Sequence, residues 1–588
     1  MWCSVCTLYE SRLNGSRNFS RSFIDGITDP GTLKRDQASK HRKSEQHLRA
    51  MGMHTNPFTR AELYRQTAIG KCLVTAETED RERVDKLVDI CYMMAREEIA
   101  FSKFPSIAKL EIRHKVALGQ TYLTELKCKE ITELIGTVME TDFLSSVKKA
   151  QYMSVLSDGS TDVTNVEKEL FYVTFVVDAL VTTRLLAIRD VKHADAAGLT
   201  ELLLAVFEWA NIDVKKKLVG FCADGANVNL GRAGGVAVRL AREIPAPWLV
   251  VIHCVSHRFE LAVKDTFKGT GADTVIDMLV AMHFLYEKSN KRLRELNTIG
   301  EMMEEHIRKP AKANGTRWVQ HKSQACTVLH QNYAVIVAHL EAQAAEGSTV
   351  PAADKARLQG YLKTLKSLKF VLYLLYMKVI LASLGEICKN LQKASIDLLY
   401  VSSCLVQLNT SLDVIREAAA APTAATLGPL ADVLREAEDN PNEVTFKGVQ
   451  LCHGGAAVVN AFKVQMTTLA DKLKDCMVQR FRDIEHDDKI RCLKLLNTTT
   501  WPRQQEDLAE FGDDILASFI DAFRPLLEAN NVDIDELHRE WSSFKMFWLQ
   551  NLAHLSRSDL WETVMKHYSD TYPNFIHVIN VLMVFPGT

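Results

Sequence analysis

The chain has 588 residues, 47% of them apolar and 24% charged, a composition typical of packed globular protein that excludes a disordered or fibrous chain. Lysine and arginine number 71 against 73 acidic residues, so the net charge of −2 excludes a global field that would draw the whole molecule to nucleic acid. Any contact with a polyanion must come from a local patch. Thirteen cysteines, an odd number spread along a long chain, favour a reduced intracellular compartment over a secreted disulfide framework.

The first 60 residues are basic, with ten Lys or Arg and five Asp or Glu. Residues 1–55 are also poor in aliphatic side chains and can build little core by themselves. They carry a C-x2-C and an H-x5-H pattern, formed by Cys3, Cys6, His41 and His47. Two thiolates and two imidazoles suit tetrahedral zinc, and the ion would supply the folding energy that the small core lacks. The alternative is a pair of surface cysteines with unrelated surface histidines.

Basic side chains lie next to the predicted zinc ligands along the chain. They are Lys34, Arg35, Arg42 and Lys43. A metal-stabilised module with adjacent cations is typical of proteins that grip phosphates, so we expect these four residues to contact DNA.

The next segments change from helical to strand character. Apolar residues such as Leu87, Cys91 and Met94 recur at helical spacing, which predicts a helical linker domain over residues 76–146. Short runs rich in β-branched and aromatic residues then predict five strands, over 152–156, 170–177, 184–188, 218–222 and 248–252. Three strands close together, followed by strands that alternate with helices, predict an α/β fold whose mixed sheet has an antiparallel meander at one end.

Two aspartates follow predicted strands directly, and each precedes a glycine. Asp158 comes after the first strand and Asp224 after the fourth. If these two strands are parallel neighbours, both carboxylates converge at the carboxyl end of the sheet, where open α/β sheets bind ligands. Such a pair suits Mg²⁺ and the two-metal displacement chemistry of phosphodiesters. The alternative is an ordinary Asp-Gly turn at each position.

Beyond Cys254 the strand pattern disappears and residues 329–530 are predicted as an all-α insertion. The most hydrophobic stretch, 370–384, contains Lys378 and is shorter than the ~20 residues of a membrane span, so we expect a buried helix and no membrane association. The whole is therefore predicted as an α/β core with a large α-helical insertion.

Four motifs occur in a fixed order: D-G-S-T-D at 158–162, C-A-D-G-A-N at 222–227, C-V-S-H at 254–257 with L-A-V-K-D at 261–265, and T-R-W at 316–318. In this order they resemble the hAT-type transposases and the zinc-finger proteins domesticated from them. The N-terminal cysteine–histidine pattern resembles the TTF/BED-like zinc finger that precedes such cores. The resemblance covers most of the chain and implies five parts: a finger over 1–55, a helical linker over 76–146, an RNase H-like core over 147–328, an insertion domain over 329–530, and an incomplete dimerisation region over 531–588.

The resemblance also implies roles for individual residues. Asp158 and Asp224 match the two aspartates of a catalytic Asp-Asp-Glu triad. Cys254 and His257 match a CxxH motif, which we interpret as structural or DNA-proximal rather than zinc-binding. Trp318 matches a tryptophan near the DNA that is cut. With Arg317 it would offer an unpaired base a stacking face and a cation, and packing of Trp318 in the core is the alternative.

The chain departs from the family pattern at the third carboxylate. The expected glutamate belongs to a Glu-Arg-x-Phe-Ser-like motif just beyond a segment similar to Tyr572-Pro573 and Phe585-Pro586, and no such motif follows here. Ser160 also stands where a tryptophan often occurs. These departures predict either a truncated gene model or a chain retired as an enzyme.

Three hypotheses follow. The first is a domesticated, zinc-dependent DNA-binding protein of the nucleus without strand cleavage. The second is a truncated copy of an active, Mg²⁺-dependent transposase. The third is an interaction scaffold that forms a homodimer through its C-terminal helices and has lost DNA binding.

Overall fold

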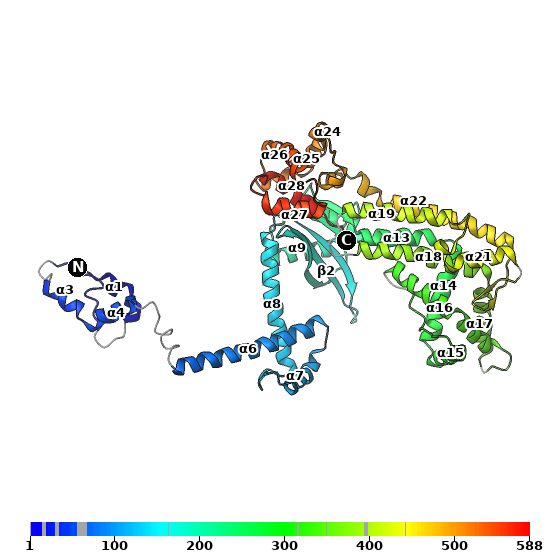
Figure 1. The fold of residues 1–588 in the computed structure, drawn as a ribbon, viewed down its shortest axis with the longest axis horizontal. Coiled ribbons are helices and arrows are strands. Elements are labelled where there is room, and N and C mark those ends of the chain that lie inside the picture. Colours follow the sequence, from blue (N-terminus) through cyan, green and yellow to red (C-terminus); the bar gives the residue numbers. More distant parts are fainter. Residues whose placement is uncertain are drawn as a thin grey trace. The chain divides into compact units, whose positions relative to one another are not determined.

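The computed structural model describes residues 2–13, 19–29, 35–55, 68–162, 164–313, 317–348, 350–392, 398–441 and 443–587. The chain separates into two compact units, Met1–Phe143 and Leu144–Thr588. In Figure 1 the first is drawn in blue and the second in cyan through red.

The N-terminal part of the first unit contains four short helices, α1 (Ser4–Leu8), α2 (Glu10–Leu13), α3 (Arg35–Arg42) and α4 (Glu45–Thr55). Helices α1 and α4 pack on one another. Their shared core consists of four buried residues, Cys6, Leu13, Ile24 and Ala50. A core this small agrees with the expectation that this segment needs a further source of folding energy.

The second part of this unit is helical, with α6 (Ala68–Arg96), η1 (Phe101–Lys103), α7 (Phe104–Arg113) and α8 (Glu125–Lys149), the last of which runs across the unit boundary. The apolar positions Leu87, Cys91 and Met94 are buried, which confirms the helical face predicted from their spacing. They pack against α7 and α8 through Phe104, Ala108 and Cys128.

The second unit contains a five-stranded mixed sheet in the order β3-β2-β1-β4-β5. Its strands are β1 (Met153–Thr161), β2 (Glu167–Val177), β3 (Leu180–Asp190), β4 (Leu218–Ala223) and β5 (Val250–His253). The first three form the predicted antiparallel meander. Strand β4 runs parallel to both β1 and β5, which confirms that the first and fourth strands are parallel neighbours. All six residues of β4 are buried, as expected for a central strand.

Short helices connect the strands on this sheet. They are α9 (Ala196–Trp209), α10 (Val214–Lys217), α11 (Asn227–Leu230) and α12 (Val236–Glu243). Helix α9 begins where the Asp195 carboxylate accepts a hydrogen bond from the Gly198 backbone N–H at 2.8 Å, an ordinary N-cap. Helices α9 and α12 pack on one another.

A long helical assembly follows β5. Its helices are α13 (Val255–Phe267), α14 (Gly271–Glu287), α15 (Asn290–Met302), α16 (Trp318–Ala344), α17 (Ala352–Leu365), α18 (Leu368–Leu391), α19 (Leu398–Glu417), α20 (Ala424–Leu427), α21 (Pro429–Asp439) and α22 (Ala456–His486). Helix α13 packs against α22, and α16 against α18 (Figure 1). The expected boundary between core and insertion at residue 328 falls inside the continuous helix α16. A small antiparallel hairpin of two-residue strands, β6 (Thr445–Phe446) and β7 (Val449–Gln450), adds strand structure that the sequence did not indicate.

Two of these helices are long and apolar enough to cross a membrane, α18 and α19. In α18 two thirds of the apolar window is buried inside the protein, and residues Phe370–Met377 are buried without interruption. The structure therefore places the most hydrophobic stretch in the core of the helical assembly, as its sequence predicted.

The C-terminal helices return to the sheet. They comprise α23 (Asp488–Arg491), η2 (Cys492–Leu496), η3 (Thr498–Thr500), α24 (Gln505–Glu510), α25 (Asp513–Ala529), α26 (Ile534–Phe547), the π-helical turn η4 (Trp548–Leu552), α27 (Arg557–His567) and α28 (Pro573–Met583). Pro586 lies so close to Gly220 of β4 that a β-carbon there would come within 2.6 Å of its ring. Glycine at position 220 therefore permits the C-terminal segment to pack directly on the central strand.

Candidate functional site

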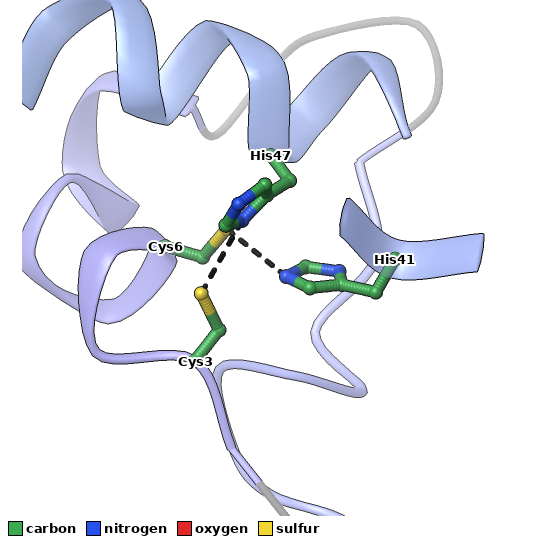
Figure 2. A group of neighbouring side chains, drawn as sticks. All are labelled: Cys3, Cys6, His41 and His47. Atoms are coloured by element: carbon green, nitrogen blue, oxygen red, sulfur yellow. Dashed lines mark hydrogen bonds between the residues drawn. The ribbon is translucent and has the colours of Figure 1, made fainter. Parts of the chain in front are cut away.

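The four predicted zinc ligands converge in the N-terminal part of the chain (Figure 2). Cys3 precedes α1 and Cys6 lies within it, His41 is near the end of α3, and His47 is in the first turns of α4. Their ligand atoms all lie within 4.8 Å of one another. Among the described residues this is the one group of three or more His, Cys, Asp or Glu side chains arranged to hold a metal ion.

The spacing of these atoms fits tetrahedral coordination. Zn–S bonds of about 2.3 Å and Zn–N bonds of about 2.0–2.1 Å place sulfur and nitrogen roughly 3.6 Å apart on one tetrahedron. The Nδ1 of His47 lies 3.4 Å from the Cys3 sulfur and 3.7 Å from the Cys6 sulfur. The Nε2 of His41 lies 3.5 Å from the Cys6 sulfur. The residues present therefore fit a zinc ion. Its ligand atoms would be the two sulfurs, Nδ1 of His47 and Nε2 of His41.

Electrostatics at this cluster also favour a cation. Burial, followed by the hydrogen bond and charge of Cys3, raises the pKa of the Cys6 thiol to about 12. Burial and the neighbouring His47 lower the pKa of His41. Two crowded sulfurs and two imidazoles are a donor set that a divalent ion stabilises by releasing the thiol protons. The His41 ring is held from its other side by Phe23, with ring centroids 4.0 Å apart.

The basic residues beside the cluster are described only in part. Lys34 lies outside the described residues, and Arg35 begins α3 with a side chain that is also outside them. Arg42 and Lys43 are exposed and follow His41 directly. A phosphate approaching this end of α3 would meet both cations.

Asp158 and Asp224 come together in the second unit. Asp224 follows β4 directly, but the expectation that Asp158 follows the first strand was wrong, because β1 continues to Thr161 in its pairing with β2 and Asp158 lies inside it, opposite Leu170. Both line one cavity of about 430 Å³. We call it the carboxylate cavity; besides the two aspartates its wall includes Cys254, His257, Glu260 and Arg317. The parallel pairing of Leu156 in β1 with Cys222 in β4 explains the convergence, because each aspartate follows its paired residue by two positions.

The two carboxylates repel one another and differ in their surroundings. Burial and then the charge of Asp224 raise the pKa of Asp158, and His257 acts in the opposite direction. Asp224 accepts hydrogen bonds from the Asn229 side-chain amide at 2.8 Å and from the Ala226 backbone N–H at 3.0 Å. A cation between the pair would relieve the repulsion, so Mg²⁺ at this place stays a prediction.

Two further carboxylates lie near this pair, and sequence reasoning missed both. Glu260 lines the cavity from α13, but its carboxylate accepts a 2.8 Å hydrogen bond from the Val319 backbone N–H at the start of α16. Glu169 of β2 accepts from the Ser157 hydroxyl and pairs in register with Gly159, so it belongs to the sheet face opposite Asp158. Burial raises the pKa of each. The charges of Asp158 and Asp224 also raise the pKa of Glu169. Among the described residues, neither glutamate forms a metal-binding group with the two aspartates.

Cys254 and His257 lie at the junction of β5 and α13. Cys254 is the N-cap residue of α13, and its backbone N–H donates to the Ala223 carbonyl at 2.8 Å. A hydrogen bond from Cys222, with further ones from the backbone N–H groups of His257 and Ser256, lowers the pKa of Cys254 to about 7 despite its burial. The structure thus places this motif on the wall of the carboxylate cavity.

A second histidine, His253, ends β5 beside His257, their ring centroids 5.5 Å apart. Burial and then the nearby Arg258 lower the pKa of His253 to about 4. Its Nε2 is buried without a hydrogen-bond partner among the described residues. The ring lies against Gly225, where a β-carbon would collide with it at 2.4 Å. His253 could have been found from the sequence only by its position at a strand end.

Helix α16 begins at Trp318, and Arg317 is its N-cap residue, so the two neighbours have different surroundings. Arg317 is exposed and lines the carboxylate cavity. Trp318 begins α16, stacks on Phe267 with ring centroids 5.7 Å apart, and has the Lys322 ammonium 5.8 Å from its ring centre. The half-buried indole therefore has structural partners of its own, and its role toward DNA stays a prediction.

The mixed sheet has helical additions and two aspartates just beyond the paired part of its parallel neighbours β1 and β4, and it is that of an RNase-like α/β domain. Residues 109–232 match the family model described as the ZMYM1/FAM200, RNase-like domain, DUF4371. The matched segment contains both Asp158 and Asp224 and ends before β5. The match indicates a transposase-derived domain of hAT type in this part of the chain.

Proposed function

We propose that the chain is a zinc-dependent, DNA-binding protein of the nucleus, descended from a hAT transposase and without strand-cleaving activity. The observation that carries the proposal is the convergence of Cys3, Cys6, His41 and His47 at sulfur–nitrogen distances suited to one zinc ion. A metal-stabilised module with exposed cations next to a metal ligand serves phosphate binding well.

DNA would meet the protein at two groups of residues. At the finger, Arg42 and Lys43, together with Lys34 and Arg35, supply charge for the backbone. At the carboxylate cavity, the exposed Arg317 is the cation that can contact a phosphate, with Trp318 behind it. Self-association through the C-terminal helices, residues 531–588, would double both contacts.

The proposed absence of cleavage is supported by the surroundings of the aspartate pair. Displacement at phosphorus by two metals needs further ligands beside Asp158 and Asp224. The third carboxylate of the cavity, Glu260, is engaged by backbone N–H groups of α16, and Glu169 belongs to the opposite face of the sheet. The second hypothesis, Mg²⁺-dependent cleavage, is tested by a nicking assay with Mg²⁺ or Mn²⁺. We expect the wild-type chain to give no nicked product. A product that forms with the wild-type chain and is lost in Asp158→Asn would support this second hypothesis instead.

DNA binding is tested by fluorescence anisotropy of the full chain with a labelled duplex at several salt concentrations. Arg42→Ala/Lys43→Ala should weaken binding to all sequences and lower the slope of log K against log[salt] by roughly 1 to 2. The matched control is Lys363→Ala/Arg435→Ala, which removes two exposed cations from the helical assembly. Equal slopes for the finger variant and the wild type would reject the finger as the DNA contact.

A further inference from the structure

A basic loop connects α15 with the start of α16. Residues 306–313, which we call the basic loop, form no helix or strand. Residues 306–340 contain no Asp or Glu, although Glu304 and Glu305 come just before them. The next basic residue after the loop is Arg317, which lines the carboxylate cavity. The loop carries three cations, Arg308, Lys309 and Lys312.

Buried side chains of α16 hold the backbone of the basic loop. Asn332 is fully buried, and its side-chain amide donates to the Arg308 carbonyl at 2.5 Å and accepts from the Arg308 N–H at 3.3 Å. The ammonium of Lys322, which is only 3% exposed, donates to the Ala313 carbonyl. These contacts satisfy backbone groups that a loop without helix or strand structure leaves unpaired.

The loop is also packed between these two points. Pro310 is buried, and its carbonyl accepts a hydrogen bond from Nδ1 of His283 in α14 at 3.2 Å. Ile307 lies against Gly300 of α15, where a β-carbon would come within 2.4 Å of its side chain. The loop therefore has a fixed course before any ligand binds, and a preformed loop loses less conformational entropy on binding.

The cations of the basic loop differ in their partners. All three are exposed. Lys309 forms an ion pair with Glu287 of α14 at 2.6 Å. In the part of the chain that the structure describes, Arg308, Lys312 and Arg317 form no ion pair. Three cations on a fixed segment thus remain without a neutralising acid, which suits a polyanion.

We propose that Arg308 and Lys312 bind the phosphate backbone of duplex DNA and lead it toward Arg317 at the carboxylate cavity. The proposal rests on the proposed function, to which it adds a second DNA contact in the second unit. Four residues of extended chain span at most ~14 Å, and over that length one DNA strand presents about four phosphates. Cations separated in this way fit a continuous backbone better than a single free phosphate.

The test is fluorescence anisotropy of the full chain with a labelled duplex at several salt concentrations. Arg308→Ala/Lys312→Ala should lower the slope of log K against log[salt] by roughly 1 to 2, because each phosphate contact contributes about 0.9. The matched control, Lys363→Ala/Arg435→Ala, should keep the wild-type slope. Both loop side chains are exposed, so the variant should keep the wild-type circular dichroism spectrum.

The finger variant Arg42→Ala/Lys43→Ala, measured beside the loop variant, separates this proposal from the proposed function. A lower slope in the finger variant with a wild-type slope in the loop variant would overturn the basic loop as a contact and keep the finger. The reverse result would keep the loop and reject the finger. No binding of the duplex by the wild-type chain would overturn both.

A second measurement uses the wild-type chain alone. Acetylation of lysines by acetic anhydride, followed by mass spectrometry, reports which ammonium groups the duplex covers. We expect bound DNA to slow acetylation of Lys312 and to leave that of Lys363 unchanged. Equal acetylation of Lys312 with and without DNA would overturn the proposal even where a variant fails to fold.

Discussion

In the carboxylate cavity Glu260 is a helix cap rather than a metal ligand, and its replacement tests this directly. In the wild-type chain the backbone N–H of Val319 donates to the Glu260 carboxylate at 2.8 Å, and the Trp318 N–H also interacts with it. Glu260→Ala removes the acceptor of both groups. The residue is only 9% exposed, so water replaces the acceptor poorly.

The magnitude follows from these contacts. A buried donor left without an acceptor costs roughly 1–3 kcal/mol, and loss of an N-terminal cap about 1 kcal/mol, so we expect Glu260→Ala to destabilise the second unit by about 2–3 kcal/mol. At about 2.1 cal/mol/K of unfolding entropy per residue, the roughly 445 residues of Leu144–Thr588 give a fall in Tm of about 2–3 °C, if the unit unfolds cooperatively. Glu260→Gln keeps one acceptor oxygen and should lose less than about 1 kcal/mol.

The assay is differential scanning calorimetry of the full chain, with titration of Mn²⁺ into the same samples. A cap predicts that Ala lowers Tm more than Gln does, and that neither changes Mn²⁺ affinity. An equal Tm in wild type and Glu260→Ala would show that Glu260 is not a cap. Loss of Mn²⁺ binding in Glu260→Gln without loss of stability would show that Glu260 is a metal ligand.

Three further predictions concern other residues. Because the folded protein raises the pKa of Asp158 above its usual 3.8, the protonated form is favoured in the folded state, and the stability that this group contributes is present below pH 3.8 and lost as pH rises through its folded pKa. Asp158→Asn should therefore raise Tm above that of the wild type by more at pH 7.5 than at pH 4. A Tm difference between variant and wild type that becomes smaller as pH rises would contradict a raised pKa of Asp158. Trp318→Ala should lower the free energy of unfolding by about 2 kcal/mol in urea titrations and Trp318→Phe by less, because the half-buried indole stacks on Phe267; equal losses would argue against packing. Arg317→Ala should leave Tm within about 1 °C of wild type, because the side chain is exposed, while weakening DNA binding in anisotropy titrations; unchanged affinity would remove the cavity from the DNA-binding surface.

The five strands and the antiparallel meander of the first three could be predicted from local pattern, whereas the parallel pairing of the first and fourth strands was a condition that the structure fulfils. Residues 152–156 and 218–222 are mostly apolar, interrupted by Ser154 and Gly220, a pattern typical of strands buried on both faces, and the chain between them has room for a meander and a crossover helix. The meeting of Asp158 and Asp224 follows from the parallel pairing of β1 with β4, since each aspartate lies two residues beyond the last pair.

Contacts made between distant segments could not be predicted. Glu260 lies on an amphipathic helix with no motif of its own, and its function as a cap depends on α16 beginning 58 residues later. The four finger ligands were found because cysteine and histidine spacing carries chemistry directly.

The claim that a zinc ion joins Cys3, Cys6, His41 and His47 is tested most directly by X-ray absorption at the zinc edge, on the full chain purified with zinc. We expect one zinc per chain with two sulfur neighbours at about 2.3 Å and two nitrogen neighbours at about 2.0–2.1 Å. Cys6→Ser should lose that signal, and Cys452→Ser should keep it. A shell without sulfur, or an unchanged spectrum in Cys6→Ser, would contradict the site and with it the proposed DNA-binding finger.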